Sequence, residues 1–226
     1  MIYLTGDTHG EFSRLSFKNF PEFRNLTKND YIIVLGDFGL IFNHSGWDNE
    51  EKYWLEFLNN RPFTTLFIDG NHECFPRLNE FPIEEWNGGK IHKISNSVFH
   101  LMRGQVFNID GVTFFTMGGA KSQDKAYRKE GKTWWEDEMP NKDELEEGVN
   151  NLDKCNWSVN YVLTHSLPTY ILKRNNGLEG DGLTSYFEHL ENDFGLTFKQ
   201  WYSGHYHLDE KLDSLHTCLY KDIVKL

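Results

Sequence analysis

The chain begins Met1-Ile2-Tyr3-Leu4-Thr5-Gly6-Asp7-Thr8-His9-Gly10. The run Ile2–Thr5 has the composition of a buried strand, and the glycines on either side of Asp7 and His9 permit a tight turn directly after it. A carboxylate and an imidazole two positions apart in an extended segment can point to the same side. Taken alone, this pattern is explained equally well by an ordinary surface turn.

The same order of an apolar run followed by a polar side chain returns four more times along the chain. The runs are Tyr31–Leu35, Thr64–Ile68, Tyr161–Leu163 and Gln200–Ser203, and the residues that follow them are Asp37, Asn71 with His72, His165, and the pair His205 and His207. Strand ends are where we expect these side chains to lie, so five short blocks describe one site assembled from the whole chain.

The wider pattern alternates strand-like runs with amphipathic segments. Strands are predicted at Ile2–Thr5, Tyr31–Leu35, Thr64–Ile68, Ile91–Ile94, Val98–Leu101, Val106–Ile109, Val112–Met117 and Tyr161–Leu163, near Gln200–Ser203 and near the C-terminus. Helices are predicted at Asp48–Asn59, Lys142–Leu152 and Thr184–Leu190. Helices between the early strands imply parallel pairing, whereas the stretch from Lys90 to Met117 is a succession of short strands. The expected fold is a mixed α/β (α+β) sandwich, formed as a single domain over residues 1–226.

Composition excludes several classes of protein. The net charge of −11 opposes strong non-specific binding to nucleic-acid backbone, which depends on Lys and Arg. No run is long enough to span a membrane, and the first strand leaves no room for a cleaved leader, so we expect a cytoplasmic location. Cys74, Cys155 and Cys218 lack metal-site or disulfide spacing and are predicted to be small buried hydrophobic residues.

The residue types in the five blocks suit divalent metal ions. Two carboxylates at neighbouring strand ends resist ionising together unless a cation lies between them, and the two oxygens of Asp37 can bridge two ions. Asn71 offers a neutral oxygen, whereas His72 beside it is expected to face a substrate. His205 and His207 lie two positions apart and can face the same side. Taken singly, Asn71 also fits an Asx turn, and His165 also fits a structural role.

The ordered set Asp7, His9, Asp37, Asn71, His72, His165, His205 and His207 resembles the calcineurin-like metallophosphoesterase superfamily over nearly the whole chain. The resemblance implies two packed mixed sheets flanked by helices, and a dinuclear metal centre whose bridging hydroxide hydrolyses phosphate esters. It implies that Asp7, His9, Asp37 and His207 hold one ion, and that Asp37, Asn71, His165 and His205 hold the other. His72 would be the catalytic residue that protonates the leaving group or stabilises its charge.

Three positions depart from the relatives that act on phosphoserine and phosphothreonine proteins. Those relatives have an Asp and an Arg where this chain has Leu40 and Ile41, and another Arg where it has Asp69. Without two guanidinium groups, forked recognition of a phosphate dianion is lost. The sequence therefore favours a phosphodiesterase or a phosphatase of small molecules or nucleotides, a nucleic-acid end being another candidate substrate, with a protein phosphatase as the alternative.

One segment could supply a substitute for the missing arginines. It runs from Gly118 to Trp135, and we expect it to overhang the metals, with Arg128 binding substrate phosphate and Trp134 and Trp135 shaping the pocket. The competing interpretation makes both Trp residues core anchors and Arg128 a surface charge. The acidic run Glu136–Glu147 is interpreted as a solvated face and a helix start.

Two further hypotheses compete with catalysis. A non-catalytic scaffold member of the superfamily should have lost ligands or His72, and a single structural metal leaves the surplus ligands unexplained. Oxygen and imidazole ligands suit Mn, which we favour, and also Fe, Zn, Ni or Co. Neither the oligomeric state nor the natural substrate follows from the sequence.

Overall fold

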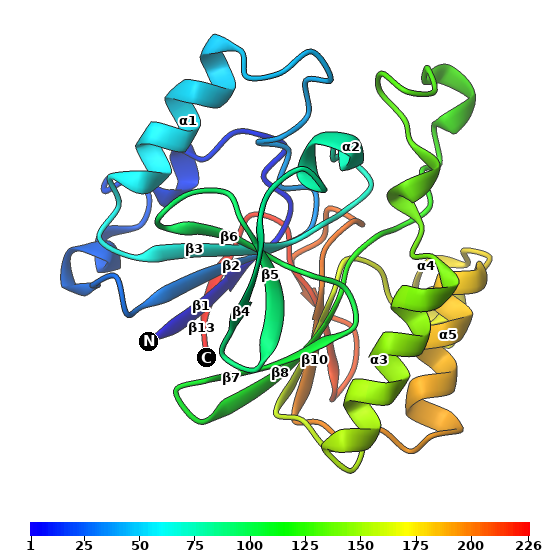
Figure 1. Cartoon of the computed structure of the whole chain (residues 1–226). Coiled ribbons are helices and arrows are strands. Elements are labelled where there is room, and N and C mark those ends of the chain that lie inside the picture. Colours follow the sequence, from blue (N-terminus) through cyan, green and yellow to red (C-terminus); the bar gives the residue numbers. More distant parts are fainter.

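The computed structural model describes residues 1–226, apart from the side chain of Asn176. Among the described residues, the strands form two facing sheets, and helices cover their outer sides (Figure 1). The first sheet has the order β13-β1-β2-β3-β6-β5-β4 and comprises β1 (Ile2–Thr5), β2 (Tyr31–Leu35), β3 (Thr64–Ile68), β4 (Ile83–Trp86), β5 (Gly89–Lys93), β6 (Val98–Leu101) and β13 (Ile223–Lys225). The second has the order β11-β12-β10-β9-β8-β7 and comprises β7 (Gln105–Ile109), β8 (Val112–Met117), β9 (Tyr161–Thr164), β10 (Gln200–Ser203), β11 (Glu210–Lys211) and β12 (His216–Cys218).

The helices connect and cover these strands. They are α1 (Asn49–Asn59), α2 (Phe75–Leu78), α3 (Lys142–Lys154), α4 (Thr169–Asn176) and α5 (Gly182–Asn192), with short 3-10 turns at Ser13–Leu15, Pro21–Asn25, Lys125–Tyr127 and Glu136–Glu138. Asp48, Asn141 and Asp181 begin α1, α3 and α5 by accepting hydrogen bonds from the first free backbone N–H groups. Each of these helices has a capping box. The sequence predicted the starts of α1 and α3 to within one residue, but it placed the start of α5 at Thr184, two residues late.

Alternation along the strands builds three apolar layers. In β2, Ile32 and Val34 face the outer core under α1, while Ile33 and Leu35 face the core between the sheets. In β9, Val162 faces the core under α3 and α5. Both faces of each sheet are therefore covered, which is why these strands read as continuous apolar runs.

The predicted fold class is confirmed: two mixed sheets pack together with helices outside. The sequence missed β4, α2 and α4, which are short or lack a clear apolar period. It was wrong about part of the acidic run, because Glu138 is buried. The three cysteines are free thiols; Cys74 and Cys218 are buried and Cys155 is half-buried.

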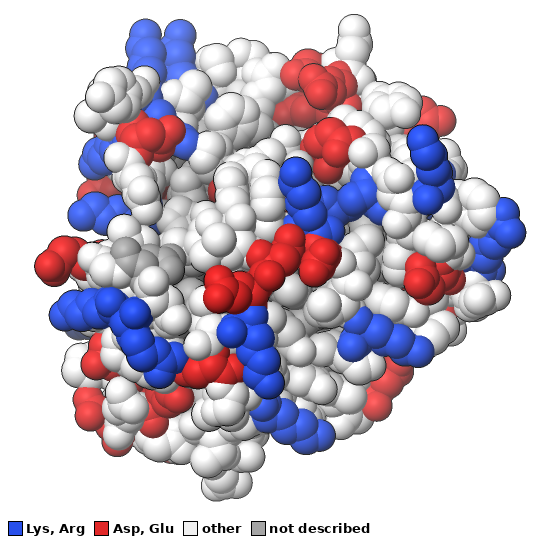
Figure 2. Space-filling view, turned by 180° about the vertical axis from the view of Figure 1, so that it is seen from behind, with Lys and Arg blue, Asp and Glu red and all other residues white. Residues whose placement is uncertain are grey.

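The surface carries charges of both signs. On the face seen in Figure 2, Lys and Arg side chains alternate with Asp and Glu side chains over its described part. Within the described residues, none of the helices has both the length and the apolar character needed to cross a bilayer.

Parallel pairing decides where the polar blocks lie. Strands β1, β2 and β3 are mutually parallel, as are β8, β9 and β10. Parallel strands end at the same edge of their sheet, and this edge is where open α/β sheets bind ligands. The loops after β1, β2, β3, β9 and β10 therefore meet at one end of the sandwich.

Candidate metal centre

One group of ligand atoms comes from the loops after β1 and β10. Nε2 of His207 lies 3.2 Å from Oδ2 of Asp7 and 3.0 Å from Nε2 of His9, and the ligand atoms of all three lie within 4.8 Å of one another. A carboxylate and two imidazoles at this separation can close around one divalent ion.

A second group lies beside the first and is centred on Asp37. Nε2 of His165 is 3.3 Å from Oδ1 of Asp37, and His205 completes a set whose ligand atoms lie within 4.8 Å of one another. Asp37 also forms a third such set with His9 and His72, with Nε2 of each imidazole 3.9 Å from Oδ2 of Asp37. Oδ1 of Asp37 thus faces His165, and its Oδ2 faces His9 and His72.

Buried atoms without partners show that the site suits cations. In the described part of the chain, Oδ2 of Asp7, Oδ1 of Asn71 and Nε2 of His165 are buried and make no hydrogen bond, although Oδ2 of Asp7 lies 3.2 Å from Nε2 of His207 and Nε2 of His165 lies 3.3 Å from Oδ1 of Asp37. Such atoms are costly to bury unless something binds them. The other polar atom of two of these side chains does have a partner. Nδ1 of His165 donates to the Leu35 carbonyl at 2.7 Å, and Oδ1 of Asp7 accepts from the His205 N–H at 2.9 Å. Each free atom is an oxygen or an imidazole nitrogen, the type that a divalent metal needs.

A chain of three buried residues orients Asn71. Its Nδ2 donates to Oγ of Ser122 at 3.1 Å, and Ser122 donates to Oε2 of Glu138 at 2.6 Å. Because the Ser122 oxygen takes the amide N–H, the amide oxygen of Asn71 is left free. Ser122 and Glu138 were not identified from the sequence as residues that support a ligand. The only sequence signal was a serine in the polar stretch that begins at Gly118.

The backbone is strained at four of the predicted ligands. Left-handed φ angles occur at His9 (47°), Asp37 (43°), His205 (70°) and His207 (54°). Each such conformation costs about 1–2 kcal/mol for a residue with a side chain. Strain of this kind persists where the surrounding structure enforces it, and it is concentrated at functional sites.

Two glycines allow neighbouring loops to approach closely. A Cβ atom on Gly36 would lie 2.0 Å from Nδ1 of His165, and one on Gly70 would lie 2.1 Å from Oδ1 of Asp37. Any larger residue at either position would push a predicted ligand out of place. The glycines in the Gly-Asp and Gly-Asn-His motifs therefore serve ligands that come from other strands.

The electrostatics follow from burying two carboxylates together. Burial alone would lower the pKa of His165, but Asp37 and Asp7 outweigh it and raise that pKa to about 9. Burial would likewise raise the pKa of Asp37, but His165 and its neighbours hold it well below its usual range. Burial and the nearby His165 lower the pKa of His205 to about 4. Without metal, the carboxylates therefore favour a proton on His165, and contact with Asp7 also raises the pKa of His207, whereas burial favours the neutral form of His205.

His72 contacts Arg128, which belongs to the segment from Gly118 to Trp135. Nη2 of Arg128 lies within hydrogen-bonding distance of Nε2 of His72, and its Nε pairs with Asp124 at 2.7 Å. Its side chain is only 9% exposed, so Arg128 is not an ordinary surface charge. Burial, with Arg128 as a smaller cause, lowers the pKa of His72. A guanidinium at Nε2 disfavours a metal ion there, although His72 belongs to one of the ligand sets.

The two tryptophans are buried, as the competing interpretation predicted. Trp135 packs with Cys74, Phe75 and Phe42, and the Phe42 ring lies parallel to His72 with centroids 6.2 Å apart. Trp134 lies under the Lys125 ammonium, which is 3.7 Å from its ring centroid. Trp135 therefore anchors the segment that presents Arg128 to the residues around α2, whereas Trp134 packs within the segment itself.

The positions where protein phosphatases carry phosphate-binding residues are structural in this chain. Leu40 and Ile41 are buried in the outer core under α1. Asp69 is buried in an ion pair with Arg103, with Nη2 to Oδ2 at 2.6 Å, and it also contacts His100. The guanidinium of Arg103 therefore serves the fold.

Two further residues that the sequence did not single out hold the ligand loops. Arg14 donates to the Asp7 carbonyl at 2.7 Å and also binds the carbonyl of Tyr220. Glu73 accepts from the Phe38 N–H at 2.7 Å, and burial raises its pKa well above the usual value. Both tie a loop of one strand to that of another.

The chain belongs to the calcineurin-like phosphoesterase family, because the model of that family matches residues 1–209. A search of curated proteins finds no match. Together with the Asp and His groups at the strand ends, this membership makes the chain, at a general level, a metal-dependent phosphoester hydrolase.

The chain of buried residues behind Asn71 predicts a measurable effect. Removing the Ser122 hydroxyl frees the Asn71 amide to rotate, so Ser122→Ala should weaken Mn²⁺ binding by about 10- to 100-fold, as is usual for residues that orient metal ligands. Calorimetric titration of metal-stripped protein measures this effect. Ser158→Ala, at an exposed serine, is the matched control. Equal affinity in Ser122→Ala and wild type would show that Asn71 holds no ion.

The raised pKa of His165 predicts that metal binding depends on pH. An ion at Nε2 displaces the proton that His165 carries below about pH 9. Affinity for Mn²⁺ should therefore rise by about tenfold per pH unit between pH 6.5 and 8.5 for each proton displaced. Titrations in buffers of different ionisation enthalpy count the protons released. A pH-independent affinity with no proton release would contradict a role for His165 as a ligand.

Proposed function

We propose that this chain hydrolyses phosphate esters at a dinuclear metal centre, and that it acts on phosphodiesters or on small-molecule or nucleotide phosphates. The observation that supports this most strongly is the position of Asp37, which belongs to one ligand set with His9 and His72 and to another with His165 and His205. Of the first set, His9 is the residue that we propose to bind metal, because His72 faces the substrate. One structural ion would need only one of these sets.

Each ion would have its own ligands. Asp7, His9, Asp37 and His207 would hold one, and Asp37, Asn71, His165 and His205 the other. Divalent ions held there, for which Mn is favoured, would supply Lewis-acid chemistry that polarises phosphoryl oxygens and makes water more acidic. The protein's own contribution is to hold these ligands in place through the strained backbone and the buried hydrogen bonds.

His72 and Arg128 would act on the substrate. Burial lowers the pKa of His72, which supports a neutral imidazole that stabilises charge on the leaving oxygen through an N–H hydrogen bond. Arg128, held by Asp124, would turn its Nη2 from His72 to a phosphoryl oxygen. It would thus replace the arginines that Ile41 and Asp69 do not supply.

Two cavities beside the centre support a substrate with two substituents. One, of about 260 Å³, is lined by His9 and His72 among others. The other, of about 320 Å³, is lined by His205, Tyr206, Ser166 and Lys121 among others. A phosphodiester fills both, whereas a monoester fills one. The buried Leu40 and Asp69 weigh against phosphoproteins as substrates.

Hydrolysis of p-nitrophenyl phosphate and bis-p-nitrophenyl phosphate with Mn²⁺ tests the proposal. We expect turnover of at least one, with the diester favoured, and a loss of at least about a hundredfold in Asp37→Asn, which removes the charge shared by both ions. No turnover of either compound by protein that binds metal would favour the non-catalytic scaffold. A strong preference for phosphopeptides over both would instead indicate a protein phosphatase.

Replacing Arg128 tests its role in phosphate binding. A hydrogen bond to a charged group contributes about 1.5–3 kcal/mol, so Arg128→Ala should lower kcat/KM by about 10- to 100-fold. Steady-state kinetics on the better p-nitrophenyl ester measures this change, and Lys129→Ala, at the exposed neighbour, is the control. If Arg128→Ala leaves KM and kcat unchanged on every phosphoester tested, Arg128 does not bind substrate.

A further inference from the structure

The cavity of about 260 Å³ lies on the His72 side of the metal centre. His9 and Gly10 line it from the loop after β1, Leu40 and Phe42 from the loop after β2, and Glu50 and Trp54 from α1. Because His72 is the residue proposed to face the leaving oxygen, the group that this oxygen carries would enter this cavity.

Three carboxylates lie around the cavity, and two of them are already engaged. Glu51 is paired with Arg77 at 2.9 Å and accepts the N–H groups of Phe42 and Asn43. Asp48 accepts the N–H groups of Glu50 and Glu51 at the start of α1. Their charges are therefore compensated by a guanidinium and by a helix N-terminus.

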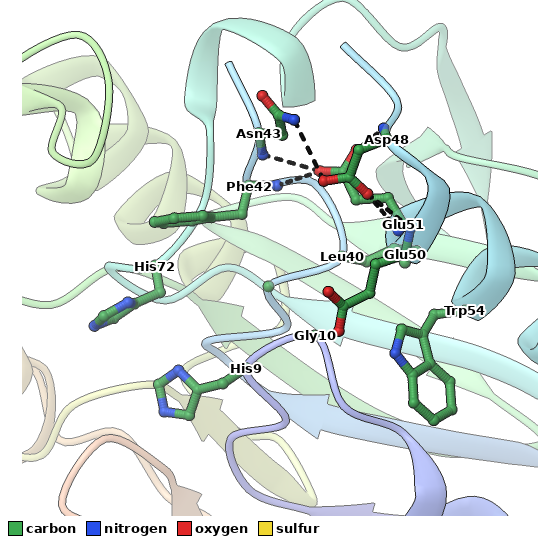
Figure 3. Close-up of a pocket in the computed structure, with 11 residues that line it drawn as sticks. His9, Gly10, Leu40, Phe42, Asn43, Asp48, Glu50, Glu51, Trp54 and His72 are labelled. Atoms are coloured by element: carbon green, nitrogen blue, oxygen red, sulfur yellow. Dashed lines mark hydrogen bonds between the residues drawn. The ribbon is translucent and has the colours of Figure 1, made fainter. Parts of the chain in front are cut away.

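Glu50 is the third. It is an exposed residue, and its carboxyl group forms no hydrogen bond or ion pair with the described residues. Figure 3 shows this group pointing into the cavity, between His9 and His72 on one side and the indole of Trp54 on the other. A free carboxylate beside an aromatic ring attracts a cation and a hydrogen-bond donor, and repels an anion.

We propose that this cavity binds the leaving alcohol, and that Glu50 and Trp54 select an alcohol bearing an ammonium group. The inference rests on the proposed hydrolysis and specifies its substrate class as phosphate esters of amino alcohols. In the reaction the bond between phosphorus and the alcohol oxygen breaks, water supplies the new oxygen on phosphorus, and a proton from that water ends on the released alcohol. The ammonium group stays on the alcohol and contacts Glu50.

A series of three esters of similar size tests the selection. The esters are 2-aminoethyl, propyl and 2-carboxyethyl phosphate, each offered as the monoester and as the methyl diester, with Mn²⁺ and with alcohol release measured by chromatography. An exposed charge pair and a cation near a ring are each worth a few-fold in rate, so kcat/KM should be about three- to fivefold higher for the ammonium ester than for the propyl ester. For the 2-carboxyethyl ester, kcat/KM should be lower than for the propyl ester by a similar factor.

Glu50→Gln removes the charge while keeping the size and the helix start. It should bring the three kcat/KM values to within about twofold of one another. Glu56→Gln, at an exposed position of the same helix, should keep the wild-type ratios. Equal ratios in wild type and Glu50→Gln, or no preference for the ammonium ester in wild type, would overturn the inference while leaving the hydrolase proposal intact. Failure of wild type to hydrolyse any ester would overturn the hydrolase proposal itself.

Discussion

Two buried carboxylates at neighbouring strand ends are the constraint on which the rest of the site depends. Asp7 is fully buried and Asp37 is 2% exposed, and His165 lies against both, 4.0 Å from one and 3.3 Å from the other. Two buried carboxylates that contact the same imidazole are stable in their charged forms only with a cation between them. In the metal-free chain, the raised pKa of His165 favours a proton that supplies this charge. The atoms of Asp7, Asn71 and His165 that make no hydrogen bond indicate where metal ions would supply it instead.

Packing of the surrounding loops and sheets offsets the free-energy cost of the buried carboxylates and the strained backbone. The backbone is left-handed at His9, Asp37, His205 and His207. The surrounding loops pack closely because Gly36 leaves room for His165 and Gly70 leaves room for Asp37. The hydrogen bonds of Arg14, Ser122 and Glu73 fix these loops from behind. Because both faces of both sheets are covered with apolar side chains, the strand ends are a rigid base for the strained loops.

The fold and the clustering of the candidate ligands could be predicted from the sequence because both depend on local sequence patterns. Apolar runs mark buried strands, and polar residues directly after them must lie at the sheet edge. The chain behind Asn71 could not be found in this way, because Glu138 lies in an acidic run that looks solvated and is joined to Asn71 only by tertiary contacts. The contact between Arg128 and His72 likewise depends on how Trp135 anchors a long loop against Cys74 and Phe75. β4 and α2 are too short to show a period. Antiparallel pairing with β5 forms β4, whose residues are mostly exposed, and α2 is held by its buried side chains.

The number of metal ions bound per chain tests the central claim most directly. Metal-stripped protein, incubated with Mn²⁺, freed of excess ion and analysed for metal and protein content, should retain two ions per chain, because Asp37 is shared by two ligand sets. A value of one tightly held ion would contradict the dinuclear centre and would indicate a single structural metal.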